Sequence, residues 1–221
     1  MILQTEQLTK RYLHKNGEVF ALKDISISID RGSFVTITGP SGAGKTTLLL
    51  ALGGLIRPTS GKIIFNTTSL HNASDNELAS FRLNNVGFIM QNFALIPYLT
   101  AVENIMTPLS LQGKPKDFQR HAALNLLEEV GLADRINHHP RELSSGQQQR
   151  VAIARALVNS PSVLFADEPT GNLDPFLSQE ILNLLNKLNR EKGITVILVT
   201  HSQLAESFGT HKIIIKQGMI E

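Results

Sequence analysis

Residues 39–46 read Gly39-Pro40-Ser41-Gly42-Ala43-Gly44-Lys45-Thr46, which matches the phosphate-loop pattern G-x-x-x-x-G-K-[ST]. Glycines in such a loop let backbone N–H groups converge on phosphate oxygens without a clash from Cβ atoms. The helix expected after the loop points the positive end of its dipole at the same oxygens. Lys45 can add a positive charge at the β- and γ-phosphates, and the Thr46 hydroxyl can bind Mg²⁺. The loop therefore predicts a nucleoside triphosphate site.

The residues that flank the loop predict the strand and the helix that this pattern needs. Ser33 to Thr38 is short and mostly apolar, as in a buried strand, and the apolar run from Thr47 to Leu55 is long enough for a buried helix. A second helix is expected farther on, through about Arg82, because Ser74 and Glu77 have the spacing of a capping box. A chance turn is the alternative to a phosphate loop, and the strand–loop–helix order argues against it.

Two further apolar runs, Val163 to Ala166 and Thr195 to Thr200, predict parallel strands that are covered on both faces. Between them, the apolar residues 181, 184, 185 and 188 form one helical stripe. This helix is expected to begin at Asp174-Pro175 and to end at Gly193. Strand–helix–strand alternation of this kind predicts an α/β sheet.

Two regions depart from this alternation. Residues 1 to about 32 and residues 61 to 70 alternate apolar and polar positions, which predicts half-exposed antiparallel strands. Residues from about 92 to 158 carry helical patterns instead. The sequence therefore predicts a helical insertion in a sheet domain.

The composition excludes several classes of protein. Apolar residues make up 42% of the 221 residues and charged residues 18%, which argues against a disordered chain. The formal net charge of +2 is too small to indicate a nucleic-acid patch or a polybasic membrane tail. The absence of Cys excludes disulfides, thiolate zinc sites and Cys nucleophiles. The longest apolar run, Leu48 to Ile56, is far shorter than the about 20 residues of a membrane span, so we expect a soluble chain whose membrane role comes through a partner.

An acidic pair, Asp167-Glu168, ends the predicted strand that begins at Val163. An acidic residue at the carboxyl end of a strand beside a phosphate loop is placed to hold Mg²⁺, and we assign this role to Asp167. Glu168 lies one residue beyond the strand and can act as the general base for a water molecule at the γ-phosphate. An ordinary acidic pair at a strand end is the alternative, and the phosphate loop argues against it.

Three further features narrow the class: the stretch Leu143-Ser144-Ser145-Gly146-Gln147, Gln91 after an apolar strand, and His201 at the end of another strand. Together with the phosphate loop and the acidic pair, they resemble the ATP-binding subunit of an ABC (ATP-binding cassette) transporter, from about Leu8 to the end. The resemblance implies an α/β fold, with a P-loop NTPase (RecA-like) core, an antiparallel β subdomain and an inserted α-helical subdomain.

The resemblance also implies how the chain is divided. Residues 1–221 are expected to form a single ATP-binding domain. Its core and β subdomain are expected to cover about 1–91 and 160–221, and its helical subdomain about 92–159.

Residues 143–147 resemble the signature motif of the family. In the family this motif lies at a helix N-terminus and caps the γ-phosphate of ATP held by the other subunit. The sequence supports such a helix, because Ser144 or Ser145 can cap a run that extends to about Asn159. The usual third residue of the motif is Gly, and Ser145 departs from it. A plain capped surface helix is the alternative.

Single residues carry the rest of the resemblance. Gln91 resembles the Q-loop residue that contacts Mg²⁺ or the attacking water, and His201 resembles the switch histidine, which can donate a hydrogen bond to the γ-phosphate. Asp174 ends a stretch that resembles the D-loop at the dimer interface, and it can also serve as a helix cap. Tyr12 resembles the aromatic residue that stacks on adenine, or it is a packed strand residue. A Gln after a strand is more often solvated, and a lone His is more often structural.

The expected cofactors are ATP and Mg²⁺. The expected catalytic residues are Glu168 and His201, and the expected metal ligands are Thr46, Gln91 and Asp167. The residues expected to contact the nucleotide are Tyr12, Gly39, Pro40, Ser41, Gly42, Ala43, Gly44, Lys45, Thr46, Thr47, Gln91, Ser144, Ser145, Gly146, Gln147 and Asp174.

Residues 91–105 and 169–174 are similar to one branch of the family, which contains the ATPases of lipoprotein release, macrolide-type export and the bacterial cell-division complex. The resemblance implies an ATP-dependent homodimer that drives an integral membrane permease or mechanotransmitter. It also implies a peripheral location on the cytoplasmic face of the inner (cell) membrane, and no nucleic acid. In the family the stretch after the Q-loop helps to form the groove for the permease. Leu95, Ile96 and Leu99 fit such a groove, or else the core.

Two other functions are alternatives to a transporter subunit. A soluble ABC ATPase acting on DNA or chromosomes inserts long coiled coils or Cys-ligated zinc modules between the phosphate loop and the signature. The segment from Lys45 to Ser144 has neither the room nor the Cys residues for them. A P-loop kinase has no use for a signature motif.

Overall fold

A mostly parallel sheet carries the phosphate loop. The computed structural model describes residues 1–14 and 17–221. The strands of this sheet are β4 (Phe34–Thr38), β7 (Val86–Ile89), β8 (Val163–Asp167), β9 (Thr195–Val199), β10 (His211–Lys216) and β11 (Met219–Ile220). Their order is β11-β10-β4-β9-β8-β7, and only the β10–β11 pair is antiparallel. Every residue of β4, β8 and β9 is buried, which explains the continuous apolar runs in the sequence.

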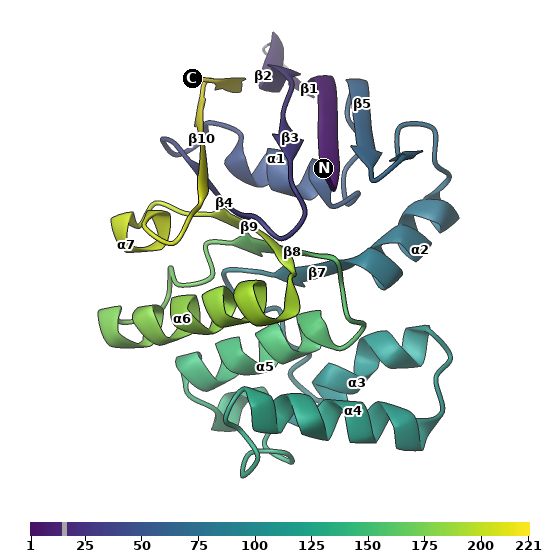
Figure 1. The fold of residues 1–221 in the computed structure, drawn as a ribbon, viewed down its shortest axis with the longest axis vertical. Helices are drawn as coiled ribbons and strands as arrows, with labels where there is room; N and C mark the ends of the chain where they lie inside the picture. The colour runs from purple at the N-terminus through teal and green to yellow at the C-terminus, as the bar shows by residue number, and fades with distance from the viewer. Residues whose placement is uncertain (15–16) are drawn as a thin grey trace.

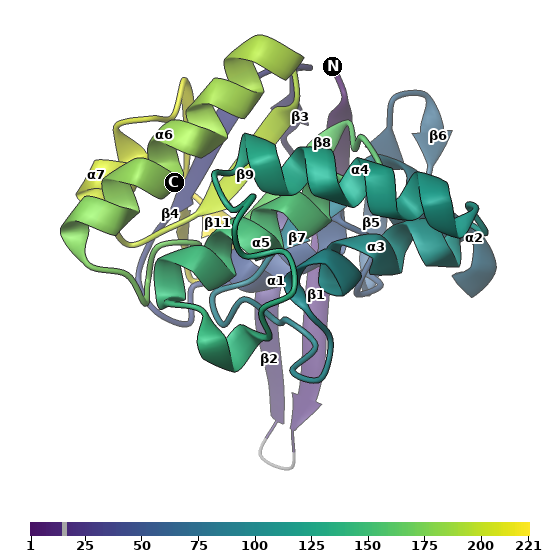
Figure 2. The same ribbon diagram turned by 90° about the horizontal axis from the view of Figure 1, so that it is seen from below.

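A second, antiparallel sheet packs over the first. Its strands are β1 (Leu3–His14), β2 (Gly17–Ile25), β3 (Ser28–Ile29), β5 (Ser60–Phe65) and β6 (Thr68–Ser69). The order is β2-β1-β5-β6, with β3 paired to β1. In Figure 1 these strands stand above β4, β9, β8 and β7 of the parallel sheet, and in Figure 2 the β1–β2 hairpin extends past the helices. The alternating pattern of the sequence therefore predicted antiparallel pairing correctly.

Helices cover both faces of the parallel sheet. The helices of the described residues are α1 (Lys45–Leu52), α2 (Asp75–Asn85), α3 (Ala101–Leu111), α4 (Lys116–Glu129), the 3-10 turn η1 (Pro140–Glu142), α5 (Ser145–Leu157), α6 (Pro175–Lys192) and α7 (Gln203–Glu206). Leu48 and Leu49 of α1 share one buried cluster with residues of both sheets. Ile153 of α5 and Ile181 of α6 pack on the opposite face of the parallel sheet. These two helices lie below the sheet in Figure 1.

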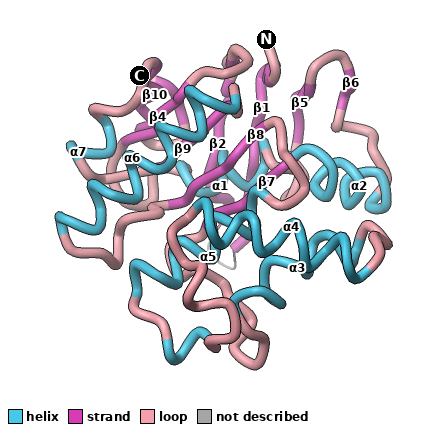
Figure 3. The backbone as a smooth tube through the Cα atoms, turned by 60° about the horizontal axis from the view of Figure 1, so that its bottom comes forward, coloured by secondary structure: helices cyan, strands magenta, loops and turns pink. Residues whose placement is uncertain are grey.

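The helices α3, α4 and α5 follow β7 and precede β8 in the chain. They enclose a buried apolar cluster of their own, which includes Val102, Ile105, Ala123 and Leu127. Figure 3 shows these three helices gathered on one side of the strands. The helical patterns of residues 92–158 therefore correspond to helices that the chain inserts after β7 and before β8, two strands that are neighbours in the sheet.

Two helix ends differ from the prediction. The helix after the phosphate loop ends at Leu52 rather than Leu55, because Gly53 and Gly54 follow and Gly54 adopts a left-handed φ of 68°. The capping box of Ser74 is present as predicted, but α2 continues past Arg82 to Asn85. The α6 helix has the predicted cap at Asp174 and the predicted left-handed Gly193 at its end.

Candidate nucleotide-binding site

The phosphate loop connects β4 to α1 and is built on closely packed glycines. Gly39 has φ 141° and Gly44 has φ 105°, values that side chains other than glycine rarely adopt. A Cβ atom on Gly39 would collide with the carbonyl oxygen of Ile215, and one on Gly44 would collide with that of Ala21. Glycine is therefore required at both positions for the loop to fit between β2 and β10.

Lys45 begins α1 and is 5% exposed. Its Nζ donates hydrogen bonds to the carbonyl oxygens of Gly39 at 3.0 Å and Pro40 at 2.9 Å. Burial lowers the pKa of this ammonium, while the nearby charges of Glu168 and Asp167 raise it. The ammonium thus lies inside the curve of the loop, where an anion can bind.

Asp167 ends β8 next to the loop, as the sequence predicted. The Thr46 hydroxyl donates to Asp167 Oδ1 at 3.1 Å. Burial raises the pKa of the Asp167 carboxyl, the Thr46 hydrogen bond lowers it, and the charge of Glu168 raises it further. A hydroxyl and a carboxylate together offer the oxygen ligands that Mg²⁺ prefers, so these two residues fit a metal ion.

Glu168 leaves the strand in a left-handed conformation, with φ 45°. The backbone holds this geometry, because Glu168 N–H donates to Val199 O at 2.9 Å and Gly171 N–H donates to Glu168 O at 3.0 Å. Its Oε1 lies 3.2 Å from Nε2 of His201, and a cavity of about 490 Å³ opens beside this pair. A carboxylate and an imidazole therefore meet at the carboxyl ends of β8 and β9.

Gln91 reaches the same edge of the sheet. If Gly171 carried a Cβ atom, that atom would lie 3.0 Å from Gln91 Nε2 and 3.5 Å from Glu168 Oε2. Both side chains therefore lie close to Gly171. The Asn172 side chain also donates to the carbonyl oxygen of Gln91 at 2.9 Å. The structure thus brings Gln91 beside the predicted general base.

The signature residues lie elsewhere in the chain. Ser144 caps α5, and the side chains of Ser144 and Gln147 each accept a hydrogen bond from the other residue's N–H. Gly146 is buried, and a Cβ atom there would lie 3.1 Å from the Leu177 side chain of α6. Among residues 1–14 and 17–221, no hydrogen bond joins residues 144–147 to the phosphate loop. The two motifs also lead into helices on opposite faces of the parallel sheet, α1 and α5, so they form separate parts of one chain.

Asp174 is confirmed as a helix cap, because its Oδ1 accepts the N–H of Leu177 at 2.9 Å. The predicted D-loop stretch thus leads directly into the first turn of α6.

Tyr12 lies on the exposed β1–β2 hairpin with 41% of its surface accessible. The Lys10 ammonium lies 5.1 Å from the centre of its ring. Val19 is directly opposite Tyr12 in the strand pairing and is 54% exposed. Val19 is not among the residues predicted from the sequence, although an aromatic residue on an antiparallel strand commonly pairs with an apolar neighbour on the next strand.

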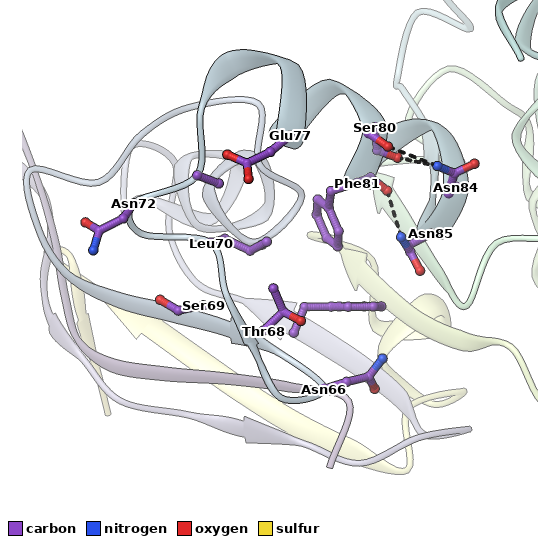
Figure 4. Close-up of a pocket in the computed structure, with 12 residues that line it drawn as sticks. Asn66, Thr68, Ser69, Leu70, Asn72, Glu77, Ser80, Phe81, Asn84 and Asn85 are labelled. Atoms are coloured by element: carbon purple, nitrogen blue, oxygen red, sulfur yellow. Dashed lines mark hydrogen bonds between the residues drawn. The ribbon is translucent and has the colours of Figure 1, made fainter.

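A second cavity, of about 500 Å³, lies between the β5–β6 hairpin and α2 (Figure 4). Its lining is rich in amides and hydroxyls, and within residues 1–14 and 17–221 Glu77 is the one charged residue that lines it. Several of these polar groups already have partners within the protein: Asn84 Nδ2 donates to Ser80, Asn85 Nδ2 donates to Phe81 O, and Glu77 completes the cap of α2. This cavity therefore lacks the cationic groups that a phosphate needs, in contrast to the loop at Lys45.

Comparison with known proteins settles the family. A family model described as "ABC transporter" matches residues 22–171, which is more than half of the chain. The chain belongs to the ABC transporter family. This ABC cassette is 45% identical to the lipoprotein-releasing system ATP-binding protein LolD of Geobacter metallireducens, over 94% of the chain and 92% of that relative. It is 44% identical to the macrolide export ATP-binding/permease protein MacB of Syntrophobacter fumaroxidans, over 100% of the chain but 31% of that relative.

A solved structure also resembles the ABC cassette closely. It is the ATP-binding cassette MJ0796 of Methanocaldococcus jannaschii, described as a dimer in a post-hydrolysis state bound to ADP and Pi. The TM-score is 0.93 and the identity 41%, over 100% of this chain and 97% of the other. These matches confirm the predicted fold class and an ATP-binding, ATP-hydrolysing cassette of transporter type. None of the relatives named here is described as acting on DNA. In the described parts of the chain, no helix is both long and apolar enough to cross a membrane.

Proposed function

We propose that two copies of this chain bind two ATP molecules head to tail and that their closing and opening drives a membrane permease. The observation that carries the proposal is the separation of the site into two parts. Lys45, Asp167 and Glu168 lie together, whereas Ser144 caps a helix elsewhere. A second copy can supply the missing helix N-terminus, which binds anions. The MJ0796 cassette, which is described as a dimer, supports this arrangement.

Within each site the residues take distinct roles. The backbone of residues 39–47 and the Lys45 ammonium bind the phosphates, while Tyr12 and Val19 form the surface for adenine. The partner's copy of residues 144–147 caps the γ-phosphate, and Asp174 lies at the edge of that contact. Thr46, Gln91 and Asp167 would hold Mg²⁺, which would neutralise phosphate charge.

Hydrolysis follows from the pair at the sheet edge. Glu168 Oε1 accepts a proton from a water molecule while the oxygen of this water attacks the γ-phosphorus. The bond between the γ-phosphorus and the ADP oxygen then breaks. His201, 3.2 Å from Glu168, donates a hydrogen bond to the γ-phosphate and stabilises the charge that develops there. Loss of the phosphate shared by two subunits then weakens the dimer.

The groove for the permease lies between α2, β7, α3 and α5 and measures about 880 Å³. Leu55, Leu83, Met90 and Leu111 contribute apolar surface, and none of the described residues that line the groove is acidic. An apolar groove of this size on an exposed face is typical of a site for a partner segment. Of the stretch predicted to line it, Leu95 packs against the buried cluster of α3–α5 instead, and neither Ile96 nor Leu99 is among the lining residues.

The names of two relatives support the branch of the family that the sequence resembles. MacB is named as an ATP-binding/permease protein, and the chain matches 31% of it. LolD is named for a lipoprotein-releasing system. We therefore place this cassette in the lipoprotein-release or macrolide-export branch, peripheral on the cytoplasmic face of the inner membrane.

Purified protein tests the core of the proposal. We expect Mg²⁺-dependent release of phosphate from ATP and a monomer–dimer transition that needs ATP and not ADP, measured by size-exclusion chromatography with light scattering. DNA should leave the rate unchanged. Stimulation by DNA would favour the soluble DNA-acting alternative and contradict the proposal.

Leu111→Glu tests the groove. Leu111 is 74% exposed, so the charge should leave folding and the hydrolysis rate of the isolated protein unchanged. It should abolish co-purification of the membrane permease from detergent-solubilised membranes, because a carboxylate in an apolar contact loses its hydration. Phe118→Glu, at a residue that is 52% exposed and outside the groove, is the matched control. Equal permease recovery with both variants would refute the groove assignment.

Tyr12→Ala tests the adenine surface. Stacking of a base on an aromatic ring contributes about 1–3 kcal/mol, so KM for ATP should rise by about 5- to 150-fold, with kcat much less affected. Tyr12→Phe keeps the ring and should resemble the wild type. Tyr98→Ala changes the other, 77% exposed Tyr and serves as the control. A normal KM for Tyr12→Ala would show that Tyr12 is only a strand residue.

A further inference from the structure

The loop that follows β7 is held from two directions. The Asn172 side chain donates Nδ2–H to the carbonyl oxygen of Gln91 at 2.9 Å. The Arg155 guanidinium donates to the carbonyl oxygens of Phe93 at 2.9 Å and Ala94 at 2.6 Å. Asn172 precedes α6 and Arg155 lies on α5, so two separate elements bind one short segment of backbone.

This segment has a backbone conformation that needs outside support. Phe93 and Ala94 are consecutive non-glycine residues in the left-handed region, with φ of 61° and 49°, which is a strained arrangement. Their carbonyl oxygens are the two that Arg155 binds. Removing these hydrogen bonds should therefore let residues 93 and 94 relax to ordinary conformations.

Arg155 itself has no carboxylate partner among the described residues. Its side chain is half-buried on α5, and this burial lowers the pKa of the guanidinium. A partly buried cation still needs polar partners, and the carbonyl oxygens of Phe93 and Ala94 provide them. Lysine cannot reproduce these contacts, because a single ammonium lacks the planar fork of the guanidinium.

We propose that Asn172 and Arg155 are positioning residues, which hold the backbone of residues 91–94 so that the Gln91 side chain stays beside Glu168. This inference rests on the proposed role of Gln91 in the nucleotide site. The geometry supports it directly: Gly171 packs against the Gln91 amide, and the next residue, Asn172, binds the Gln91 carbonyl. One turn of chain therefore fixes both ends of Gln91 relative to the general base.

Asn172→Ala removes one of these hydrogen bonds without touching the phosphate loop. Loss of one hydrogen bond at Gln91 should lower kcat by about fivefold while KM for ATP changes by less than about twofold. Asn172→Asp lacks the same donor and should give the same loss. The matched control is Asn183→Ala, an exposed residue of α6, which should resemble the wild type.

Arg155→Lys removes the other contact, with Arg120→Lys on the exposed surface of α4 as its control. Amide hydrogen exchange provides a readout that does not depend on turnover. Exchange at residues 91–94 should become faster in Asn172→Ala and Arg155→Lys, and should be unchanged in the two controls. Unchanged exchange at these residues in both Asn172→Ala and Arg155→Lys would overturn the inference.

A double variant separates positioning from general stability. If Asn172 acts through the Gln91 side chain, adding Asn172→Ala to Gln91→Ala should lower kcat by less than about twofold. The same fivefold loss in both backgrounds would overturn the inference, because it would show a purely structural effect. Wild-type protein without ATPase activity would instead contradict the proposed function. If the wild type is active and Asn172→Ala and Arg155→Lys change neither kcat nor hydrogen exchange, this inference alone is contradicted.

Discussion

Glu168→Gln is expected to lower the turnover of ATP by about 10²- to 10⁴-fold, the usual contribution of a general base. Gln keeps the shape of the side chain but cannot accept a proton from water. Lys45 and Thr46 are unchanged, so ATP binding should survive. Phosphate release and calorimetric ATP titration on one preparation measure both quantities.

The matched control is Glu191→Gln, which alters an exposed carboxylate of α6 and should turn over ATP normally. The Glu168→Gln protein should also accumulate as an ATP-bound dimer on size-exclusion chromatography, because the phosphate that joins the subunits is not removed. Undiminished turnover would rule out Glu168 as the base. Loss of ATP binding would show that the substitution damages the site itself.

Lys45→Ala is expected to weaken ATP binding by about 10- to 100-fold. Hydrogen bonds to charged groups contribute about 1.5–3 kcal/mol, and the Lys45 ammonium is the cation enclosed by the loop carbonyls of Gly39 and Pro40. The loss should appear in the dissociation constant measured by titration calorimetry. It should also appear as a smaller rise in melting temperature on addition of ATP.

Lys187→Ala is the control for this change, since Lys187 is an exposed residue of α6. Its affinity for ATP should equal that of the wild type. An unchanged affinity in Lys45→Ala would contradict the phosphate-binding role, whatever its effect on turnover.

The elements that could be predicted from the sequence are those specified by local chemistry. The phosphate loop, the caps at Ser74 and Asp174, and the buried strands β8 and β9 depend on residue types within a few positions of one another. The end of α1 was missed because Gly53 and Gly54 were counted as part of an apolar run. Gly53 packs against the Phe88 ring, a contact that spacing along the chain does not show.

The residues that support the site could not be predicted from patterns in the sequence. Asn172 binds a carbonyl 81 positions away, and Arg155 binds carbonyls 61 and 62 positions away. Residue types do not show which backbone carbonyl a side chain will bind, because every residue has a carbonyl. Side chains that act on phosphate or water could be predicted from their types, whereas side chains that act on the backbone required the fold.

The left-handed backbone of Glu168 has a consequence for how this protein can change. At φ 45° glycine is the residue that the backbone favours, and a carboxylate there lowers the stability of the fold. Selection for turnover and selection for stability therefore act in opposite directions at this position. An ABC cassette that no longer needed to hydrolyse ATP would be free to become more stable here, and drift at residue 168 would be an early sign that a lineage had lost the activity.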